Sequence, residues 1–234
     1  MIFIGSGFLV FQAVEHSLKQ GIDVGLVLCP ENDSAIPKLK KLGIKFEIVK
    51  NPNTYLMQFL KNQEGRFVFS INNKFILNDD LLKTKNFFFN IHNGLIQKYR
   101  GISEVCVLAA LHNRENFYGA TFHRLLPEQS VDSGPIISQL EFEIKSTDDF
   151  MVVMKHSLKV CDEIFKKNLL DIIQIKSEDI YVPISEKIYT YSSLEDILSN
   201  YELENLKKLL SSSVFFPKLN SIVASYVNKK EGKE

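Results

Sequence analysis

The first 145 residues alternate short apolar runs with segments of helical periodicity, and this alternation constrains the fold more than any other feature of the chain. The run 24–29 is apolar throughout, as expected for a strand that is covered on both faces. Strands separated by helices of this size predict a parallel sheet with right-handed crossovers. We expect strands at 1–4, 24–29, 45–49, 67–70 and 87–91, and helices at 9–19, 34–41 and 55–61.

The pattern changes after residue 91. We expect a packed helix at 105–111, two further strands at 120–123 and 136–142, and a long helix that ends near residue 170. Short helices are expected at 194–199 and 202–210, and a frayed tail from about residue 228. The predicted fold class is therefore α/β: a Rossmann-like, mostly parallel sheet with helices on both faces. Residues 1–170 would form the catalytic domain, and residues 171–234 a short C-terminal extension packed on it.

Charge and cysteine content exclude several classes of function. The 234 residues include 28 basic and 28 acidic side chains, so the chain has no overall attraction for nucleic acid. Its three cysteines show no CxxC spacing, which argues against a disulfide framework or a zinc site, and we expect no metal. We see no signal peptide and no apolar stretch of the ~20 residues that span a membrane. We therefore expect a cytoplasmic protein without a membrane partner.

A glycine turn near the start resembles part of a dinucleotide fingerprint. Gly5-Ser6-Gly7 follows a strand and opens a helix, but Val10 stands where the third glycine is needed. No acidic residue follows the second strand at the position that the fingerprint requires, since that strand ends in Cys29-Pro30. We favour a tight turn over a dinucleotide site, and an oxidoreductase is correspondingly disfavoured. Backbone N–H groups at this helix start could still hold a phosphate of some substrate.

Three polar side chains stand at the ends of later strands. Asn90 and His92 end the fifth strand, and Asp132 lies on the loop between the next two. Ligands of open parallel sheets gather at the carboxyl ends of strands, so all three plausibly reach the same edge. An amide can donate to an oxyanion, an imidazole can move a proton, and a carboxylate can orient the imidazole. Together they predict acyl transfer without a nucleophilic side chain.

Four short motifs occur in a fixed order around these residues, at 90–92, 99–101, 119–123 and 132–134. The chain resembles the 10-formyltetrahydrofolate-dependent formyltransferase family, whose members carry Asn-x-His, Tyr-Arg-Gly, Gly-x-Thr-x-His and Asp-x-Gly. Departures are Leu95-Ile96-Gln97 in place of a Leu-Leu-Pro turn, and Asn93 after the histidine. The resemblance covers residues 1–145 well and residues 171–224 faintly. The matching segments are Asn90-Ile91-His92, Tyr99-Arg100-Gly101, Gly119-Ala120-Thr121-Phe122-His123 and Asp132-Ser133-Gly134.

The resemblance implies direct formyl transfer from 10-formyltetrahydrofolate to an amine, with Asn90, His92 and Asp132 as the catalytic residues. Asn90 and protonated His92 would face the oxyanion, with Asp132 beside the ring. Arg100, Thr121 and His123 are candidate substrate contacts, although such an arginine more often pairs with loop carbonyls or an acid. The residues that would contact the folate cofactor are Ser70, Ile71, Asn72, Phe75, Ile76, Leu77, Val131, Ser133 and Gly134.

The acceptor is the least determined part of the prediction. The chain is neutral and its last 60 or so residues are too few for a typical further domain, which counts against methionyl-tRNA. The Gly-Ser-Gly turn departs from the phosphate turn of glycinamide ribonucleotide enzymes. We therefore expect a nucleotide-linked amino sugar and, by resemblance, a homodimer. Hydroxyornithine, glycinamide ribonucleotide and methionyl-tRNA stay open as other acceptors. A peptide-synthetase accessory role and a non-catalytic folate or nucleotide-sugar binding module also stay open.

Overall fold

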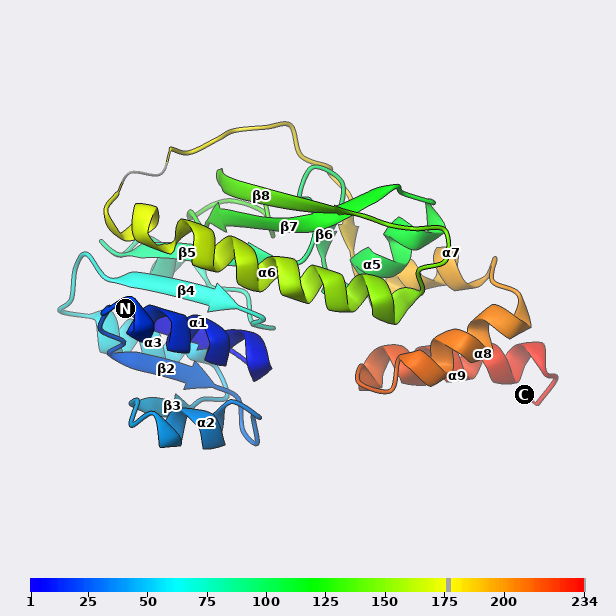
Figure 1. Cartoon of the computed structure of the whole chain (residues 1–234), viewed down its shortest axis with the longest axis horizontal. Helices are drawn as coiled ribbons and strands as arrows, with labels where there is room; N and C mark the ends of the chain where they lie inside the picture. Colours follow the sequence, from blue (N-terminus) through cyan, green and yellow to red (C-terminus); the bar gives the residue numbers. More distant parts are fainter. Residues whose placement is uncertain (176–177, 234) are drawn as a thin grey trace.

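A seven-stranded sheet forms the centre of the computed structural model, which describes residues 1–175 and 178–233 (Figure 1). The strand order is β3-β2-β1-β4-β5-β7-β8. The first five of these strands run parallel, β7 is antiparallel to β5, and β8 is antiparallel to β7, so the expected mostly parallel sheet is confirmed. The strands are β1 (Ile2–Gly5), β2 (Leu26–Cys29), β3 (Phe46–Ile48), β4 (Phe67–Ile71), β5 (Phe87–His92), β7 (Phe117–Arg124) and β8 (Ile136–Glu143).

Helices cover both faces of this sheet, as the alternation of side chains along each strand requires. Phe3 packs against α1 (Gly7–Lys19), α2 (Ile36–Lys41) and α6 (Phe150–Ile173). Its neighbours Ile2 and Ile4 point to the other face, towards α3 (Pro52–Leu60) and α4 (Asp79–Leu82). The four-residue α4 was not expected, because one capped turn is too short to show a helical period.

Phenylalanine rings join the central strands to α6. The ring centroids of Phe69 lie 5.3 Å from Phe89 and 5.6 Å from Phe165, and Phe3 and Phe122 complete the cluster. Each such pair contributes about 0.5–1.5 kcal/mol beyond the area it buries. Because β4 and β5 are fixed against each other here, the loops at their carboxyl ends have a rigid base.

A second apolar cluster joins the sheet to the C-terminal extension. Helix α5 (Ser103–His112) is buried continuously over residues 105–110 and packs with α7 (Leu194–Leu198), α8 (Leu203–Ser212) and α9 (Pro217–Lys230). Helix α9 extends to Lys230, into the segment from about residue 228 that was expected to fray. Leu219, Val223 and Val227 recur every four residues and are buried, which makes one helix of this segment.

Two short strands lie outside the main sheet. β6 (Arg100–Gly101) pairs in parallel with β9 (Ile188–Tyr189), and the 3₁₀ turn η1 (Tyr191–Ser193) follows. A strand of two residues is too short to show an alternating pattern of apolar residues, so neither strand was predicted from the sequence. Cys29, Cys106 and Cys161 are buried free thiols.

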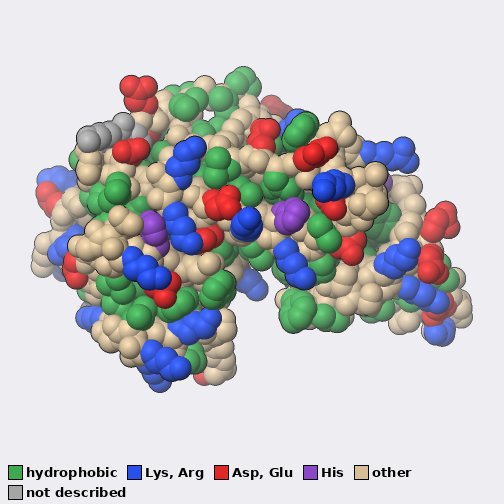
Figure 2. All heavy atoms as spheres, viewed as in Figure 1, with side chains coloured by type: hydrophobic (Ala, Val, Ile, Leu, Met, Phe, Trp, Pro, Cys, Tyr) green, Lys and Arg blue, Asp and Glu red, His purple; other side chains and the backbone are tan. Residues whose placement is uncertain are grey.

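The surface shows no preference for one sign of charge in the view of Figure 2, where basic and acidic side chains intermingle. Over the described residues, none of the helices combines the length and the hydropathy that a membrane span requires.

Candidate active site

The three expected catalytic residues meet at the carboxyl edge of the sheet. β5 ends at Asn90 and His92, and the loop between β7 and β8 brings Asp132 back against them. His92 Nδ1 lies 3.2 Å from Asp132 Oδ2, and Asn90 Nδ2 donates to Asp132 Oδ1 at 3.3 Å. Each oxygen of the Asp132 carboxylate therefore faces one of the two other residues.

A second histidine belongs to the same cluster. His123 pairs with Asn90 across β5 and β7, and its Nε2 lies 3.1 Å from Asn90 Nδ2 and 3.6 Å from Asp132 Oδ1. Its Nδ1 faces the backbone carbonyl of Arg124 at 3.1 Å. That carbonyl only accepts, so Nδ1 carries the proton and Nε2 accepts from the Asn90 amide. His123 therefore fixes which way the amide points.

The His92 ring has an oxygen atom facing each of its nitrogens. Nδ1 faces Asp132, and Nε2 lies 2.8 Å from the Tyr99 carbonyl oxygen. The doubly protonated ring donates to both oxygens, and the neutral ring donates to one of them. The expected N–H from His92 to an oxyanion is thus already committed within the protein, because the ring is 4% exposed and packed behind Asp132.

Gly94 is required by this placement of the ring. A Cβ atom at Gly94 would lie 2.6 Å from His92 Nε2 and 2.7 Å from the Tyr99 carbonyl oxygen. Real Cβ atoms do not approach neighbours this closely, so any other residue would displace the imidazole. The glycine after the Asn-x-His motif is therefore part of the geometry of the site.

Burial and charge act in opposite directions on the two ionisable partners. Burial lowers the pKa of His92, while Asp132 and the Tyr99 carbonyl raise it. Burial would raise the pKa of Asp132, but the facing His92 ring, when it is charged, and the Gly101 N–H hold it well below its ordinary value. Asp132 is therefore a carboxylate at neutral pH, set among N–H groups.

Hydrogen bonds from Arg100 hold the loop that carries Asp132. The guanidinium is 2% exposed and donates through Nε to the Val131 carbonyl at 2.9 Å. It also donates to the Ser130 hydroxyl and to the Ser185 carbonyl. Asp132 itself has φ +49°, a left-handed conformation that Asp tolerates better than most residues. The expected pairing of Arg100 with loop carbonyls is confirmed.

The three candidate substrate contacts are buried instead of facing a cleft. Arg100 is 2% exposed, and Thr121 and His123 are fully buried. Thr121 donates to the Gly94 carbonyl at 2.7 Å and accepts from Gln139 at 2.8 Å. Their positions on strands β6 and β7, inside the sheet edge, leave these side chains no surface for direct contact with an acceptor.

The expected folate residues divide into buried and exposed sets. Ser70, Ile71, Leu77 and Gly134 are buried, and Val131 and Ser133 are half-buried. Asn72 is exposed, with φ +51°, and its amide donates to Ser6 at 3.1 Å. Phe75 and Ile76 are 42% and 69% exposed, which is unusual for large apolar side chains beside a sheet edge.

The turn before α1 is occupied by a carboxylate of the protein. Gly7 N–H faces both Asp33 oxygens, at 2.9 and 3.0 Å, and Ala35 N–H donates to the same side chain at 2.8 Å. The possibility of a phosphate on this N–H is thus contradicted, because an internal anion already fills the position. Asp33 was missed from the sequence, although an acid after the second strand was the signal to follow.

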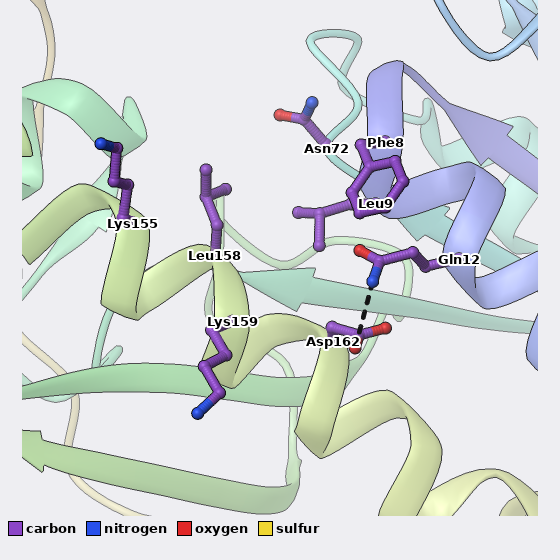
Figure 3. Close-up of a pocket in the computed structure, with 8 residues that line it drawn as sticks. All are labelled: Phe8, Leu9, Gln12, Asn72, Lys155, Leu158, Lys159 and Asp162. Carbon is purple, nitrogen blue, oxygen red and sulfur yellow. Dashed lines mark hydrogen bonds between the residues drawn. The ribbon is translucent and has the colours of Figure 1, made fainter.

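Two hollows open on the surface, the first near the carboxyl edge of the sheet and the second away from it. The first, about 370 Å³, opens between α1 and α6 (Figure 3). Phe8, Leu9 and Leu158 supply its apolar lining and Asn72 borders it, so it adjoins the loop after β4. The second, about 700 Å³, lies between the end of α5, the start of α6 and α8. In the described part of the chain no group of three or more His, Cys, Asp or Glu side chains is arranged to hold a metal ion.

The chain is similar in sequence to two differently named proteins. No family model matches the chain. It is 30% identical over 174 residues to the bifunctional polymyxin resistance protein ArnA of Wigglesworthia glossinidia brevipalpis, an alignment that covers 70% of this chain and 26% of that protein. It is 24% identical over 208 residues to methionyl-tRNA formyltransferase of Thermotoga sp. strain RQ2, covering 80% of this chain and 65% of the relative. The chain thus spans a quarter to two thirds of these relatives.

Solved structures agree on the fold. The N-formyltransferase from Helicobacter canadensis, in complex with folinic acid and dTDP-3-aminofucose, superposes with a TM-score of 0.71 at 21% identity. The match covers 86% of this chain and 73% of that one. Sheet order, strand ends and the matched length together show that this chain has the formyltransferase fold.

Proposed function

We propose that this chain is an N-formyltransferase that moves a formyl group from 10-formyltetrahydrofolate to the amine of a nucleotide-linked amino sugar. One observation carries the proposal: the Asp132 carboxylate, buried at the sheet edge, faces Asn90 Nδ2 at 3.3 Å and His92 Nδ1 at 3.2 Å. A carboxylate set among N–H groups at the carboxyl ends of strands is suited to acyl transfer to an amine.

Each residue of the cluster has a separate role in this proposal. Asp132 would accept a hydrogen bond from the incoming amine and stabilise the positive charge that develops on it. The proton that the amine loses would pass by way of Asp132 to the folate nitrogen, which leaves as its bond to the formyl carbon breaks. Asn90 donates one amide hydrogen towards the formyl oxygen, releasing its longer contact of 3.3 Å to Asp132. His123 keeps the amide in this orientation, and His92 supports the charge of Asp132 from behind.

The residues after β4 fit a flat heteroaromatic ring. Phe75 and Ile76 offer exposed apolar surface, and the loop of Val131 and Ser133 lies half-buried at the same sheet edge. Bound there, 10-formyltetrahydrofolate supplies a formyl carbon activated by its attachment to nitrogen. The complex of the Helicobacter canadensis enzyme with folinic acid supports this choice of donor.

The choice of acceptor rests on two supports. The same relative was solved with dTDP-3-aminofucose. In this chain Asp33 fills the amide position before α1, so an acceptor whose phosphate must bind that turn, as in glycinamide ribonucleotide, would meet a carboxylate. A nucleotide-linked sugar can place its phosphates elsewhere. Homodimerisation stays a prediction.

The test is a transfer assay with 10-formyltetrahydrofolate and a panel of amines: dTDP- and UDP-amino sugars, hydroxyornithine, glycinamide ribonucleotide and methionyl-tRNA. Mass spectrometry of each acceptor detects the added formyl group. We expect transfer to at least one nucleotide-linked amino sugar and none to glycinamide ribonucleotide. Folate binding, measured by calorimetry, without transfer to any amine would instead support a binding module.

A further inference from the structure

Residues 178–189 of the extension return to the catalytic loops. They pass beside β8, where Ile180 pairs with Ile136, and lead to α7 (Figure 1). On the way, Ile188 and Tyr189 pair with Arg100 and Gly101, and the Tyr189 carbonyl also accepts from Ile102 N–H at 2.8 Å. These contacts place part of the extension directly beside the residues that touch the Asp132 loop.

One link from this segment reaches the backbone of the loop. The Arg100 guanidinium donates to the Ser185 carbonyl on one side and to Ser130 Oγ and the Val131 carbonyl on the other. Among the described residues no carboxylate lies within ion-pair distance of this buried cation. Its planar guanidinium fork therefore donates only to neutral acceptors, and it links the segment of Ser185 to the loop of Ser130 and Val131.

A second link reaches the side chain of the catalytic acid. Gly101 N–H donates to Asp132 Oδ2 at 3.0 Å, the oxygen that faces His92. Gly101 has φ +110°, and a Cβ atom there would lie 2.3 Å from the Tyr189 carbonyl oxygen. Pairing with β9 thus requires glycine at 101 and fixes the direction of the N–H that Asp132 accepts.

We propose that residues 185–189 of the C-terminal extension position the catalytic site, with Arg100 and Gly101 as the positioning residues through which they hold Asp132 against His92. This rests on the proposed function. The two links are independent, since one fixes the backbone before Asp132 and the other its carboxylate. Formyl transfer then depends on a segment that lies more than fifty residues beyond Asp132 in the sequence.

The rest of the extension is anchored separately, which makes the proposal testable in the full chain. Leu194, Ile197 and Leu198 pack against α5 in the second apolar cluster. Tyr191 donates to Glu104 of α5 and has no contact with Arg100, Gly101 or Asp132 among the hydrogen bonds of the structure. Tyr191→Phe therefore loses one hydrogen bond of the extension without touching either link, and serves as the matched control.

The test compares Arg100→Lys, Gly101→Ala and Ser130→Ala with Tyr191→Phe. Lysine keeps the charge but not the fork, alanine at 101 collides with Tyr189, and Ser130→Ala removes one acceptor with little risk to folding. For Arg100→Lys we expect kcat to fall about tenfold or more, as for one lost charge-assisted hydrogen bond, with KM nearly unchanged. Gly101→Ala should act in the same direction, Ser130→Ala more weakly, and Tyr191→Phe should match the wild type.

Two readouts are independent of turnover. Hydrogen exchange of the Gly101 amide should accelerate about tenfold in Arg100→Lys, because its acceptor is loosened. The NMR titration of His92 should shift its pKa downwards, since Asp132 raises that pKa and would no longer be held against the ring. Wild-type exchange and an unchanged titration in both Arg100→Lys and Ser130→Ala would overturn the positioning role. If no amine is formylated by the wild type, the proposed function fails while these two readouts still decide the proposal.

Discussion

Replacing Asp132 with asparagine separates the charge of this side chain from its shape. The backbone there has φ +49°, which asparagine tolerates as well as aspartate, so the loop keeps its conformation. The two carboxylate oxygens face different donors: Asn90 Nδ2 at 3.3 Å and Gly101 N at 3.0 Å. Whichever way the new amide is turned, its NH₂ group meets an N–H.

The size of the effect follows from these contacts. One buried donor is left unsatisfied and a charge-assisted hydrogen bond is lost, which costs about 1–3 kcal/mol of unfolding free energy. Loss of the group that takes the amine proton and stabilises the developing charge should lower kcat about a hundredfold to a thousandfold. KM should change little, because Asp132 acts on the reacting nitrogen more than on the body of the acceptor.

The assay is steady-state formyl transfer with the best acceptor of the panel, together with urea unfolding of the same samples. Asp33→Asn is the matched control: this carboxylate accepts from Gly7 and Ala35 N–H at the same sheet edge but lies outside the cluster. It should lose comparable stability and keep most of its activity. Wild-type kcat in Asp132→Asn would refute the reasoning, and equal losses of kcat in both variants would show a general structural effect.

Three further predictions concern the same cluster. His123→Leu removes the acceptor of the Asn90 amide and should lower kcat about tenfold at constant KM in the transfer assay; an unchanged kcat would show that the amide is oriented without it. Gly94→Ala places a Cβ 2.6 Å from His92 Nε2 and should cost about 1–3 kcal/mol in urea unfolding, whereas Gly25→Ala, with only one atom at 3.8 Å, should be tolerated. Burial lowers the pKa of His92 below 6.5, so between about pH 5.5 and 7.5 the unfolded chain binds more protons than the folded chain. The unfolding free energy should therefore decrease as the pH is lowered from about 7.5 to about 5.5. In His92→Gln this decrease should be less steep. Equal slopes in the two proteins would contradict the assigned direction of the pKa shift.

Much of the fold could be predicted because its signals are local. The apolar runs of β2 and β5 could be identified without knowing which segments pack against them. The helical period of α1 could be recognised within its thirteen residues. Short elements such as β6 and α4 carry no period and were missed. α9 was also missed, although its spacing of buried leucine and valine was present in the sequence.

The sequence predicted which residues form the candidate site, but it predicted their individual roles less well. Asn90, His92 and Asp132 were expected together because motifs and strand ends place them at one edge, and the structure brings them within hydrogen-bond reach. The ring of His92 was expected to face the substrate, but its outer nitrogen faces the Tyr99 carbonyl. Which surface a side chain presents depends on neighbours far away in the sequence, and no local pattern reports them.

The order of residues by itself determined the sheet, its helices and the polar groups at the ends of its strands, because periodicity and motifs act over a few residues. The tertiary structure alone decided that Arg100, Thr121 and His123 are buried, and that Asp33 fills the turn before α1. It also decided that residues 185–189 lie against Arg100 and Gly101, which contact the Asp132 loop. These outcomes depend on contacts between segments that only chain folding brings together, where burial and hydrogen-bond geometry select among partners that the sequence leaves equivalent.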